Sequence, residues 1–290
     1  MHFEERCGLY RSAVEKFLQE YIASCHAEPQ HKLYEAMEYS LMAGGKRIRP
    51  ILVMEFCRVC GGDWQKAVPF AAALEMIHTY SLIHDDLPCM DNDDYRRGRL
   101  TSHKVFGEGL AVLAGDALLT DAFMTAANAE LPAQRVNTAL SILSRCAGSC
   151  GMVGGQVLDI ESESRLCTEQ EILDVQIRKT GALIRAACQL GVLAGGGTQT
   201  QLEAAGKFAD KLGLAFQIRD DMLDVIGRSE ELGKAVGVDA GKNTFVRLYG
   251  IDRCGALVDS YTSDAVLALV DFSDTAFLKE LSERLTSRTK

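Results

Sequence analysis

The placement of proline is the feature that most limits how this chain can fold. All five prolines lie in the first half of the 290 residues, and none follows Pro132. Proline lacks a backbone N–H and clashes with the preceding turn, so it breaks the interior of a helix. The chain beyond Pro132 is therefore free to form long helices.

The spacing of apolar residues in the second half agrees with helices. Between residues 171 and 190 these side chains recur at steps compatible with the 3.6-residue period, namely at Ile172, Val175, Leu183, Ile184 and Ala187. Thr168 and Glu171 form a capping-box pattern that predicts the start of this helix, and a further helix is predicted over 201–226, stopping at Gly227. No stretch shows the alternating β-branched pattern typical of hairpin strands. The sequence therefore predicts an all-α protein with a single domain over residues 1–290.

Composition excludes several classes of protein. With 31 Lys and Arg against 40 Asp and Glu, the net charge is −9, which makes the chain a poor partner for nucleic acid or an anionic membrane. The ten cysteines are scattered rather than arranged as a small disulfide scaffold, so we expect reduced thiols in a cytoplasmic protein. The N-terminus is too charged to begin a signal peptide, and no uninterrupted apolar run reaches about 18 residues, so no membrane insertion is expected.

A helix predicted over 70–86 runs into three aspartates, because Asp85 and Asp86 are its last two residues and Asp91 lies five residues beyond it. Pro88 disfavours helical geometry at the residue before it, so the helix should distort or end there and let Asp91 turn back toward Asp85. Two carboxylates roughly 4 Å apart repel by about 4 kcal/mol at an effective dielectric constant near 20. A divalent cation removes that cost, and hard oxygen ligands favour Mg²⁺ completed by water and substrate phosphate. The sequence therefore predicts a magnesium site here.

A basic stretch follows directly, because Arg96, Arg97 and Arg99 come within eight residues of Asp91. Guanidinium groups next to a metal-carboxylate cluster indicate a diphosphate held between metal and arginine.

A second acidic cluster lies late in the strongly helical half. Asp220 and Asp224 are four residues apart and share a helix face, Asp221 lies beside them, and Gln217 lies one turn earlier. Like charges at this spacing destabilise an isolated helix, so this pair also predicts a cation. The residues that could contact phosphate nearby are Lys179 with Thr180 upstream, and Lys234 and Lys242 downstream.

The segment Gly44–Pro50 contains two glycines followed by three cationic side chains. Glycines let backbone N–H groups approach an anion, and the cations complete the site. The segment does not fit the Gly-x-x-x-x-Gly-Lys-Ser/Thr pattern of a P-loop, so it predicts an anion site without a nucleotide-binding fold.

Taken together, these residues resemble the short-chain trans-prenyl diphosphate synthases, and most closely the bacterial farnesyl diphosphate synthases. The resemblance covers nearly the whole chain and rests on six segments in the family's order, namely Gly44–Pro50, Met76–Gly98, Ala111–Leu119, Gly151–Ile160, Leu212–Val225 and Gly233–Phe245. It implies an all-α homodimer, each subunit a helical bundle around a central cavity. It also implies Mg²⁺-dependent head-to-tail (1′-4) condensation of isopentenyl diphosphate with dimethylallyl and geranyl diphosphate, giving a C15 product.

The resemblance implies a role for each site residue. Three Mg²⁺ ions and the allylic diphosphate would be held by Asp85, Asp86, Asp91, Asp220, Asp221 and Asp224. The allylic substrate would be contacted by Arg96, Lys179, Thr180, Gln217, Lys234 and Lys242. Isopentenyl diphosphate would be bound by Gly45, Lys46, Arg49, His78 and Arg97. The residues expected to act directly in catalysis are Asp85, Asp86, Asp91, Asp220, Lys179 and Lys234.

Product length is expected to depend on Tyr80, five residues before Asp85. A chain anchored at the metals must run back along the helices, so a ring one to two turns below can act as a floor, while the small Ser81 leaves room above it. The resemblance points the same way, because an aromatic residue at this place is the bacterial farnesyl pattern. The alternative is that Tyr80 only packs between helices with its hydroxyl hydrogen-bonded.

Three other functions stay open. A geranylgeranyl diphosphate synthase, which makes C20, uses the same chemistry. A terpene cyclase has no need of the residues assigned to isopentenyl diphosphate. An inactive helical partner subunit has no need of intact aspartate-rich segments.

Overall fold

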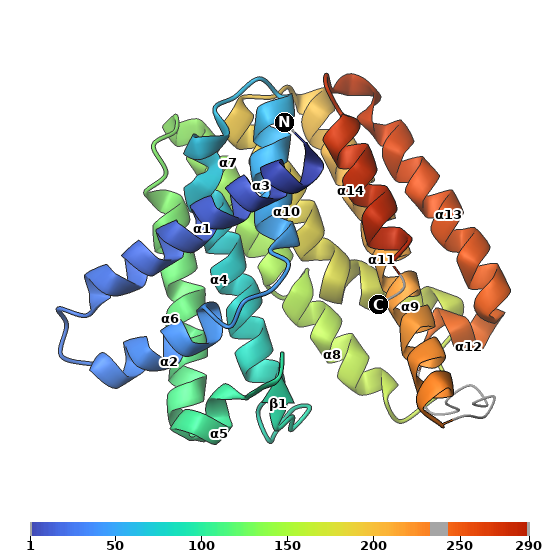
Figure 1. The fold of residues 1–290 in the computed structure, drawn as a ribbon, viewed down its shortest axis with the longest axis horizontal. Helices are drawn as coiled ribbons and strands as arrows, with labels where there is room; N and C mark the ends of the chain where they lie inside the picture. Colours follow the sequence, from blue (N-terminus) through green and yellow to red (C-terminus); the bar gives the residue numbers. More distant parts are fainter. Residues whose placement is uncertain (1, 233–242, 289–290) are drawn as a thin grey trace. The chain divides into compact units, whose positions relative to one another are not determined.

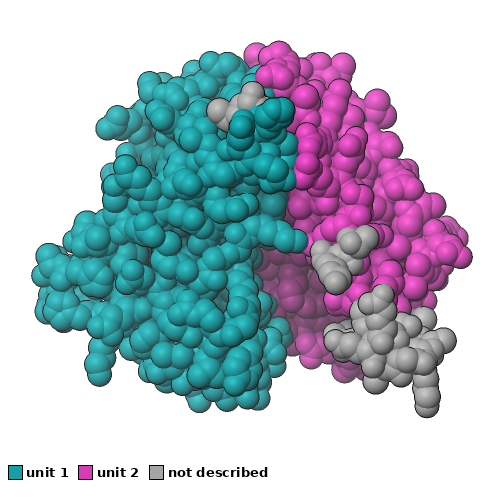
Figure 2. Space-filling view, in the orientation of Figure 1, with its two compact units in different colours: residues 1–141, 193–196 teal, residues 142–192, 197–290 magenta. Residues whose placement is uncertain are grey.

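The computed structural model describes residues 2–232 and 243–288. Helices make up most of this part of the chain (Figure 1), so the predicted all-α class is confirmed. Contacts group the chain into two compact units (Figure 2), the first made of residues 1–141 and 193–196 and the second of residues 142–192 and 197–290. The single domain over 1–290 stays a prediction.

The first unit is built from helices joined by short turns. Its elements are α1 (Phe3–Cys25), α2 (His31–Leu41), α3 (Ile48–Val59), a 3₁₀ turn (Trp64–Ala67), α4 (Val68–Asp85), β1 (Tyr95–Arg96), β2 (Arg99–Leu100), α5 (Ser102–Phe106), α6 (Glu108–Ala127) and most of α7 (Ala133–Ala147).

The second unit contains the longest helix. Its elements are α8 (Met152–Ser162), α9 (Glu169–Gln176), a π-helical turn (Ile177–Gly181), most of α10 (Ala182–Gly195), α11 (Gln199–Leu232), α12 (Phe245–Tyr249), α13 (Ile251–Leu267), a 3₁₀ turn (Ala268–Asp271) and α14 (Ala276–Thr286).

Helix α4 forms the core of the first unit, because it packs against α1, α2, α3 and α6 (Figure 1). Proline at its first turn suits a helix start, where the missing N–H has no partner to lose. Every side chain from Phe70 to Ile77 is buried, and the one charged side chain among them, Glu75, lies 2.6 Å from the guanidinium of Arg47. The other polar residues lie toward the C-terminal end of the helix, where Asp85 is the last position.

The structure adds a hairpin that the sequence does not predict. Tyr95 pairs with Leu100 and Arg96 with Arg99 in a two-stranded antiparallel ribbon. The two turn residues between them, Arg97 and Gly98, have φ of 52° and 75°. Positive φ at both positions is the geometry that suits a two-residue hairpin turn, and it does not depend on β-branched strands.

Two helix boundaries also differ from the prediction. Helix α11 continues through Gly227 to Leu232, since a single glycine inside a helix costs only about 1 kcal/mol relative to alanine. The capping box at Thr168 is confirmed, with the Thr168 N–H donating to the Glu171 carboxylate over 2.8 Å. The helix it starts is then interrupted by the π-helical turn Ile177–Gly181.

Helix α6 is long and apolar enough to cross a membrane by length and composition, with a mean hydropathy of 1.4 over its best window. Of that window, 39% is buried inside the protein, and core helices of soluble proteins meet the same criteria.

Candidate active site

The first aspartate-rich segment begins where α4 ends. Asp85 is the last helical residue, and the chain then turns so that the Asp91 N–H donates to the Asp85 carbonyl over 2.9 Å. Asn92, at φ 53°, donates its N–H to the Leu87 carbonyl over 3.1 Å and tightens the turn. The predictions that the helix ends near Pro88 and that Asp91 turns back toward Asp85 are confirmed.

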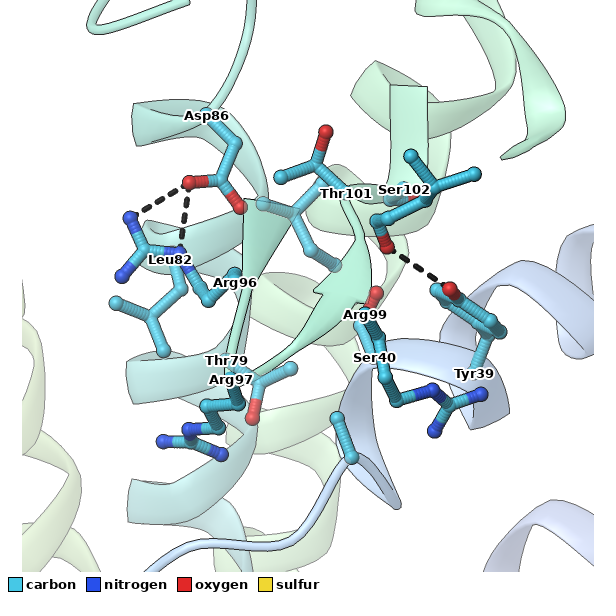
Figure 3. A pocket seen from close by; sticks show the side chains of 13 residues that line it. Tyr39, Ser40, Thr79, Leu82, Asp86, Arg96, Arg97, Arg99, Thr101 and Ser102 are labelled. Carbon is cyan, nitrogen blue, oxygen red and sulfur yellow. Dashed lines mark hydrogen bonds and ion pairs between the residues drawn. The ribbon is translucent and has the colours of Figure 1, made fainter. Parts of the chain in front are cut away.

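Asp86 is buried, unlike the other two aspartates of this segment. It is 3% exposed, and its carboxylate accepts hydrogen bonds from Arg96, 2.7 Å from Nε and 2.6 Å from Nη2. Figure 3 shows this pair at one end of a small pocket lined by α2, α4 and the β1–β2 hairpin. Burial raises the pKa of Asp86, and the bonds from Arg96 oppose that rise. The hairpin thus holds Asp86 and Arg96 together, whereas Asp85 is half-buried and Asp91 exposed.

The glycine turn before α3 approaches the hairpin turn. The Arg97 guanidinium donates to the Gly44 carbonyl, and a Cβ placed on Gly45 would lie 2.9 Å from Arg97 Nη1. Gly45 itself has φ 133°, which disfavours any other residue. Two predicted site residues far apart in sequence are therefore brought together, while the neighbouring Lys46 is exposed.

Arg49, His78 and Arg97 form an electropositive cluster in the first unit. Burial lowers the pKa of His78 well below its usual value, and the charges of Arg49 and Arg97 lower it further. The pKa of Arg49 is lowered by burial and by Arg97, against the opposing charge of Glu75. Arg49 Nε is buried and has no hydrogen-bond partner among the described residues. A buried donor among cations fits an anionic ligand.

Arg47, one of the three cations expected to complete this anion site, has a structural role instead. It is 3% exposed, and its guanidinium lies 2.6 Å from Glu75 and 3.4 Å from Glu15. It also donates to the Leu41 carbonyl over 2.7 Å. Its place at the start of α3, with φ 51°, turns the side chain into the protein, away from solvent.

The second aspartate-rich segment is anchored by one face of α11. Ile218 and Met222 are buried with Phe245 in an apolar cluster of the second unit. Asp221 faces the same way, 8% exposed, and accepts from Gln217 Nε2 at 3.2 Å and the Phe245 N–H at 3.4 Å. Burial raises the pKa of Asp221 to about 6.

Asp220 has a partner that the sequence does not suggest. The guanidinium of Arg288 contacts its carboxylate and lies 4.3 Å from the centre of the Phe216 ring. The carbonyl of Arg288 accepts from Arg219 Nε over 2.8 Å, which holds the residue in place. The two partners are 68 residues apart, so no local spacing could have revealed the pair. Asp224, on the same face of α11, is exposed.

Lys179 and Thr180 lie on the π-helical turn. The Lys179 ammonium lies 2.6 Å from the Asp159 carboxylate, and the Thr180 hydroxyl donates to Gln217 Oε1 over 3.2 Å. A Cβ on Gly155 would lie 2.2 Å from the Lys179 nitrogen, so glycine is what lets α8 approach this turn. Single π turns inside helices are frequent at functional sites.

Two predicted phosphate ligands, Lys234 and Lys242, lie outside the described residues. The residue after them, Asn243, is fixed, with its side-chain amide donating to the Ser162 and Arg165 carbonyls over 2.7 and 2.9 Å.

The carboxylates have the donor chemistry that Mg²⁺ prefers. Within residues 2–232 and 243–288, no three His, Cys, Asp or Glu side chains form a group that could hold a metal ion. In the first segment Asp91 is exposed and Asp85 half-buried, and in the second Asp224 is exposed and Asp220 half-buried beside Arg288. Mg²⁺ usually takes one or two protein carboxylates and fills its shell with water and phosphate, so these residues fit it.

The two residues expected to govern product length differ in their surroundings. Tyr80 is 6% exposed, and its ring lies 5.6 Å from that of His84 at an angle of 79°. Ser81 is half-buried, and its hydroxyl donates to the His78 carbonyl over 2.8 Å.

Comparison with known families gives one match over most of the chain. The family model described as "Polyprenyl synthetase" matches residues 30–265.

Individual proteins extend this match. The chain is 47% identical over 266 residues to a farnesyl diphosphate synthase from Micrococcus luteus, covering 90% of the chain and 91% of the relative. It is also 47% identical over 246 residues to a chloroplastic geranylgeranyl pyrophosphate synthase from Catharanthus roseus, covering 83% of the chain and 69% of the relative. Among solved structures, a geranyltransferase from Legionella pneumophila matches with a TM-score of 0.88 and 32% identity, covering 99% of this chain and 97% of the other.

Proposed function

Because the chain belongs to the polyprenyl synthetase family, we propose that it is a farnesyl diphosphate synthase, which makes C15 from dimethylallyl diphosphate through geranyl diphosphate. The family carries out prenyl chain elongation on isopentenyl and allylic diphosphates, so the chain is a prenyltransferase. The observation that carries the C15 product is a large buried ring, Tyr80, on the helix that ends in Asp85.

By the family resemblance, the aspartates of each aspartate-rich segment would bind the allylic diphosphate through Mg²⁺. Bound Mg²⁺, three ions by analogy with the family, supplies positive charge that stabilises diphosphate as a leaving group. The carboxylates that would hold Mg²⁺ are those of Asp85, Asp91, Asp220 and Asp224. The remaining two aspartates, Asp86 and Asp221, are buried beside them in their segments. Cationic side chains that add to this are Arg96, Lys179, Lys234 and Lys242, with Thr180 and Gln217 beside Lys179.

Isopentenyl diphosphate binds at the electropositive cluster. Arg49, His78 and Arg97 surround the site, Gly45 leaves space for the Arg97 guanidinium, and Lys46 lies exposed beside it. The lowered pKa of His78 keeps its imidazole neutral at pH 7, so it acts as a hydrogen-bonding group without charge.

The chemistry follows from this division of charge. The allylic C–O bond breaks as its diphosphate is stabilised, and the double bond of isopentenyl diphosphate attacks the resulting allylic cation. The departing diphosphate accepts the proton lost in the last step, so no protein base is required. Apolar packing of helices keeps water from quenching the cation.

A C20 product is the second candidate, because a geranylgeranyl pyrophosphate synthase is as similar as the farnesyl synthase. Incubation with Mg²⁺, isopentenyl diphosphate and each allylic primer in turn, followed by product-length analysis, separates the two. A main product of C20 from every primer would reject the C15 proposal. Failure to elongate any primer would instead favour an inactive partner subunit.

The proposed function includes a cytoplasmic location and a homodimeric state. The exposed apolar residues Leu113 and Met124 on α6, 57% and 50% exposed, support a second copy as their cover. Sedimentation equilibrium of the purified chain tests this, and a monomer at micromolar concentration contradicts it.

Removal of metal is expected to abolish turnover. The carboxylates that hold the diphosphate would repel it without a cation between them. Product formation should stop in excess EDTA and return when Mg²⁺ is added in excess over the chelator. Circular dichroism with and without EDTA controls for unfolding. Full turnover in chelator would reject the metal-dependent mechanism.

Arg97→Ala is expected to raise the KM for isopentenyl diphosphate by about tenfold or more and the KM for the allylic primer much less. One charge-assisted hydrogen bond is worth roughly 1.5–3 kcal/mol. Arg99→Ala is the matched control, since Arg99 lies on the same hairpin but stacks over the Tyr39 ring at 4.2 Å. Equal effects of Arg97→Ala on both substrates would contradict the assignment.

A further inference from the structure

His84, the residue before the first aspartate, packs against α6 at Val112, Gly115 and Asp116. These three residues are called the seat of His84 below. The Nε2 atom of His84 lies 3.1 Å from the Val112 carbonyl oxygen and 3.9 Å from a carboxylate oxygen of Asp116. A carbonyl can only accept a hydrogen bond, so this contact assigns the proton to Nε2. The imidazole therefore ties the end of α4 to the backbone of α6.

Gly115 is what allows the ring to lie there. A Cβ at this position would lie 2.2 Å from His84 Nε2 and 2.5 Å from Cδ2, distances at which atoms overlap. Glycine inside a helix costs roughly 0.5–1 kcal/mol relative to alanine, so its presence in the middle of α6 calls for a packing reason. The seat for His84 supplies that reason within the segment Ala111–Leu119.

The imidazole also contacts the ring of Tyr80. The two residues are one turn apart on α4, and their rings meet edge to face with centroids 5.6 Å apart. Such pairs have a preferred geometry beyond simple area burial. The position of the Tyr80 ring is therefore restrained by a residue that itself packs against α6.

We propose that His84 is a positioning residue for product length. Seated on Gly115 and bonded to the Val112 carbonyl, it holds the Tyr80 ring in the orientation that stops the growing chain. This inference rests on the proposed function, in which Tyr80 is the floor. Without the imidazole, the Tyr80 ring can rotate into the volume that His84 leaves, and the floor opens.

Product length tests the effect on Tyr80. With dimethylallyl diphosphate as primer, His84→Ala should shift the main product from C15 toward C20, the same shift that is expected of Tyr80→Ala. The double variant should go no further than Tyr80→Ala alone, because both changes remove the same barrier. His84→Gln, which keeps an N–H donor but lacks the ring, should also lengthen the product and serves if His84→Ala does not fold.

Thermal stability tests the seat independently of product length. Gly115→Ala should lower the melting temperature by about 5 °C or more, as overpacking does. Adding His84→Ala should restore much of that loss, since the overlapping ring is gone. Gly109→Ala is the matched control on the same helix, because no described residue beyond the adjacent helix backbone comes within 4 Å of a Cβ there.

The outcomes separate the two proposals. If Tyr80→Ala lengthens the product but both folded His84 variants keep C15, the role of His84 is rejected and the proposed function stands. If Tyr80→Ala also keeps C15, the floor assignment fails, and positioning through Tyr80 fails with it. If Gly115→Ala is as stable as Gly109→Ala, the seat itself is rejected.

Discussion

Asp85→Ala and Asp220→Ala are each expected to lower turnover by about 10³-fold or more while the protein stays folded. In the proposed function each substitution removes a carboxylate that would hold Mg²⁺ and the diphosphate, and loss of several kcal/mol of charge stabilisation corresponds to a rate loss of this size. Steady-state turnover at saturating Mg²⁺ and both substrates is the measurement. The expected loss concerns the chemical step, so higher substrate concentration should not restore it.

The effects on stability should differ between the two variants. Asp85 ends α4, where the helix dipole disfavours a negative charge, so the melting temperature of Asp85→Ala should hold or rise slightly. Asp220→Ala removes the carboxylate that pairs with the half-buried Arg288, so this variant should have a modestly lower melting temperature. A collapse of the fold in either variant would indicate a structural role.

Two aspartates outside the segments serve as controls. Asp94 pairs with Lys104 at 2.7 Å, and Asp210, on α11 itself, pairs with Arg185 at 2.6 Å. Both pairs are partly exposed, so their loss should be worth no more than about 1 kcal/mol. Asp94→Ala and Asp210→Ala should keep near-normal turnover. If Asp94→Ala lowers turnover as much as Asp85→Ala, or Asp210→Ala as much as Asp220→Ala, the loss is a general effect of removing a carboxylate. It would then give no support to a special role of the aspartate-rich segments.

Tyr80→Ala is expected to change the main product from C15 to C20 or longer while ionisation of the primer continues. The change removes a buried ring on α4 one to two turns before Asp85, which opens space along the helix for a longer chain. Product length is read by chromatography of the dephosphorylated alcohols. Retention of C15 by an active variant would remove the main physical support for the farnesyl assignment.

Tyr80→Phe is the control for this experiment. It keeps the ring and the edge-to-face contact with His84 but removes the hydroxyl. The product should stay C15 if ring volume forms the floor. Because replacing a buried aromatic by alanine typically costs about 3–5 kcal/mol, the alanine variant should be assayed at reduced temperature with its folding checked.

The similarity of farnesyl and geranylgeranyl synthases to this chain shows why product length is hard to infer from overall identity. Both kinds of relative share 47% identity with the chain. In the proposed mechanism, binding of diphosphate and metal is required for every product length, so overall identity does not separate C15 from C20. In the same proposal, chain length depends on the space beside Tyr80, which a single side chain can alter.

The sequence by itself determined what depends on neighbouring residues. Absence of proline after Pro132 leaves the second half helical, and the capping box at Thr168 starts its helix because both signals act within one or two turns. Pro88 ends α4 and lets Asp91 return to Asp85 for the same local reason. The positions of the aspartate-rich segments therefore follow from local signals in the chain.

Only the tertiary structure decided which charges face inward. In sequence, Asp86 and Asp221 cannot be told apart from the aspartates beside them. Packing nevertheless buries both, and their carboxylates accept hydrogen bonds from Arg96 and from the Phe245 N–H, respectively. Arg47 is one of the three cationic residues after the glycine turn, but its guanidinium forms a buried ion pair with Glu75.

The contacts of Asp220 with Arg288 and of His84 with Gly115 likewise join residues far apart in the chain. Burial and pairing of a side chain depend on which distant segments pack against it. Local spacing therefore predicts where a helix begins and ends, whereas packing within each unit decides which of its carboxylates face solvent and can bind a ligand.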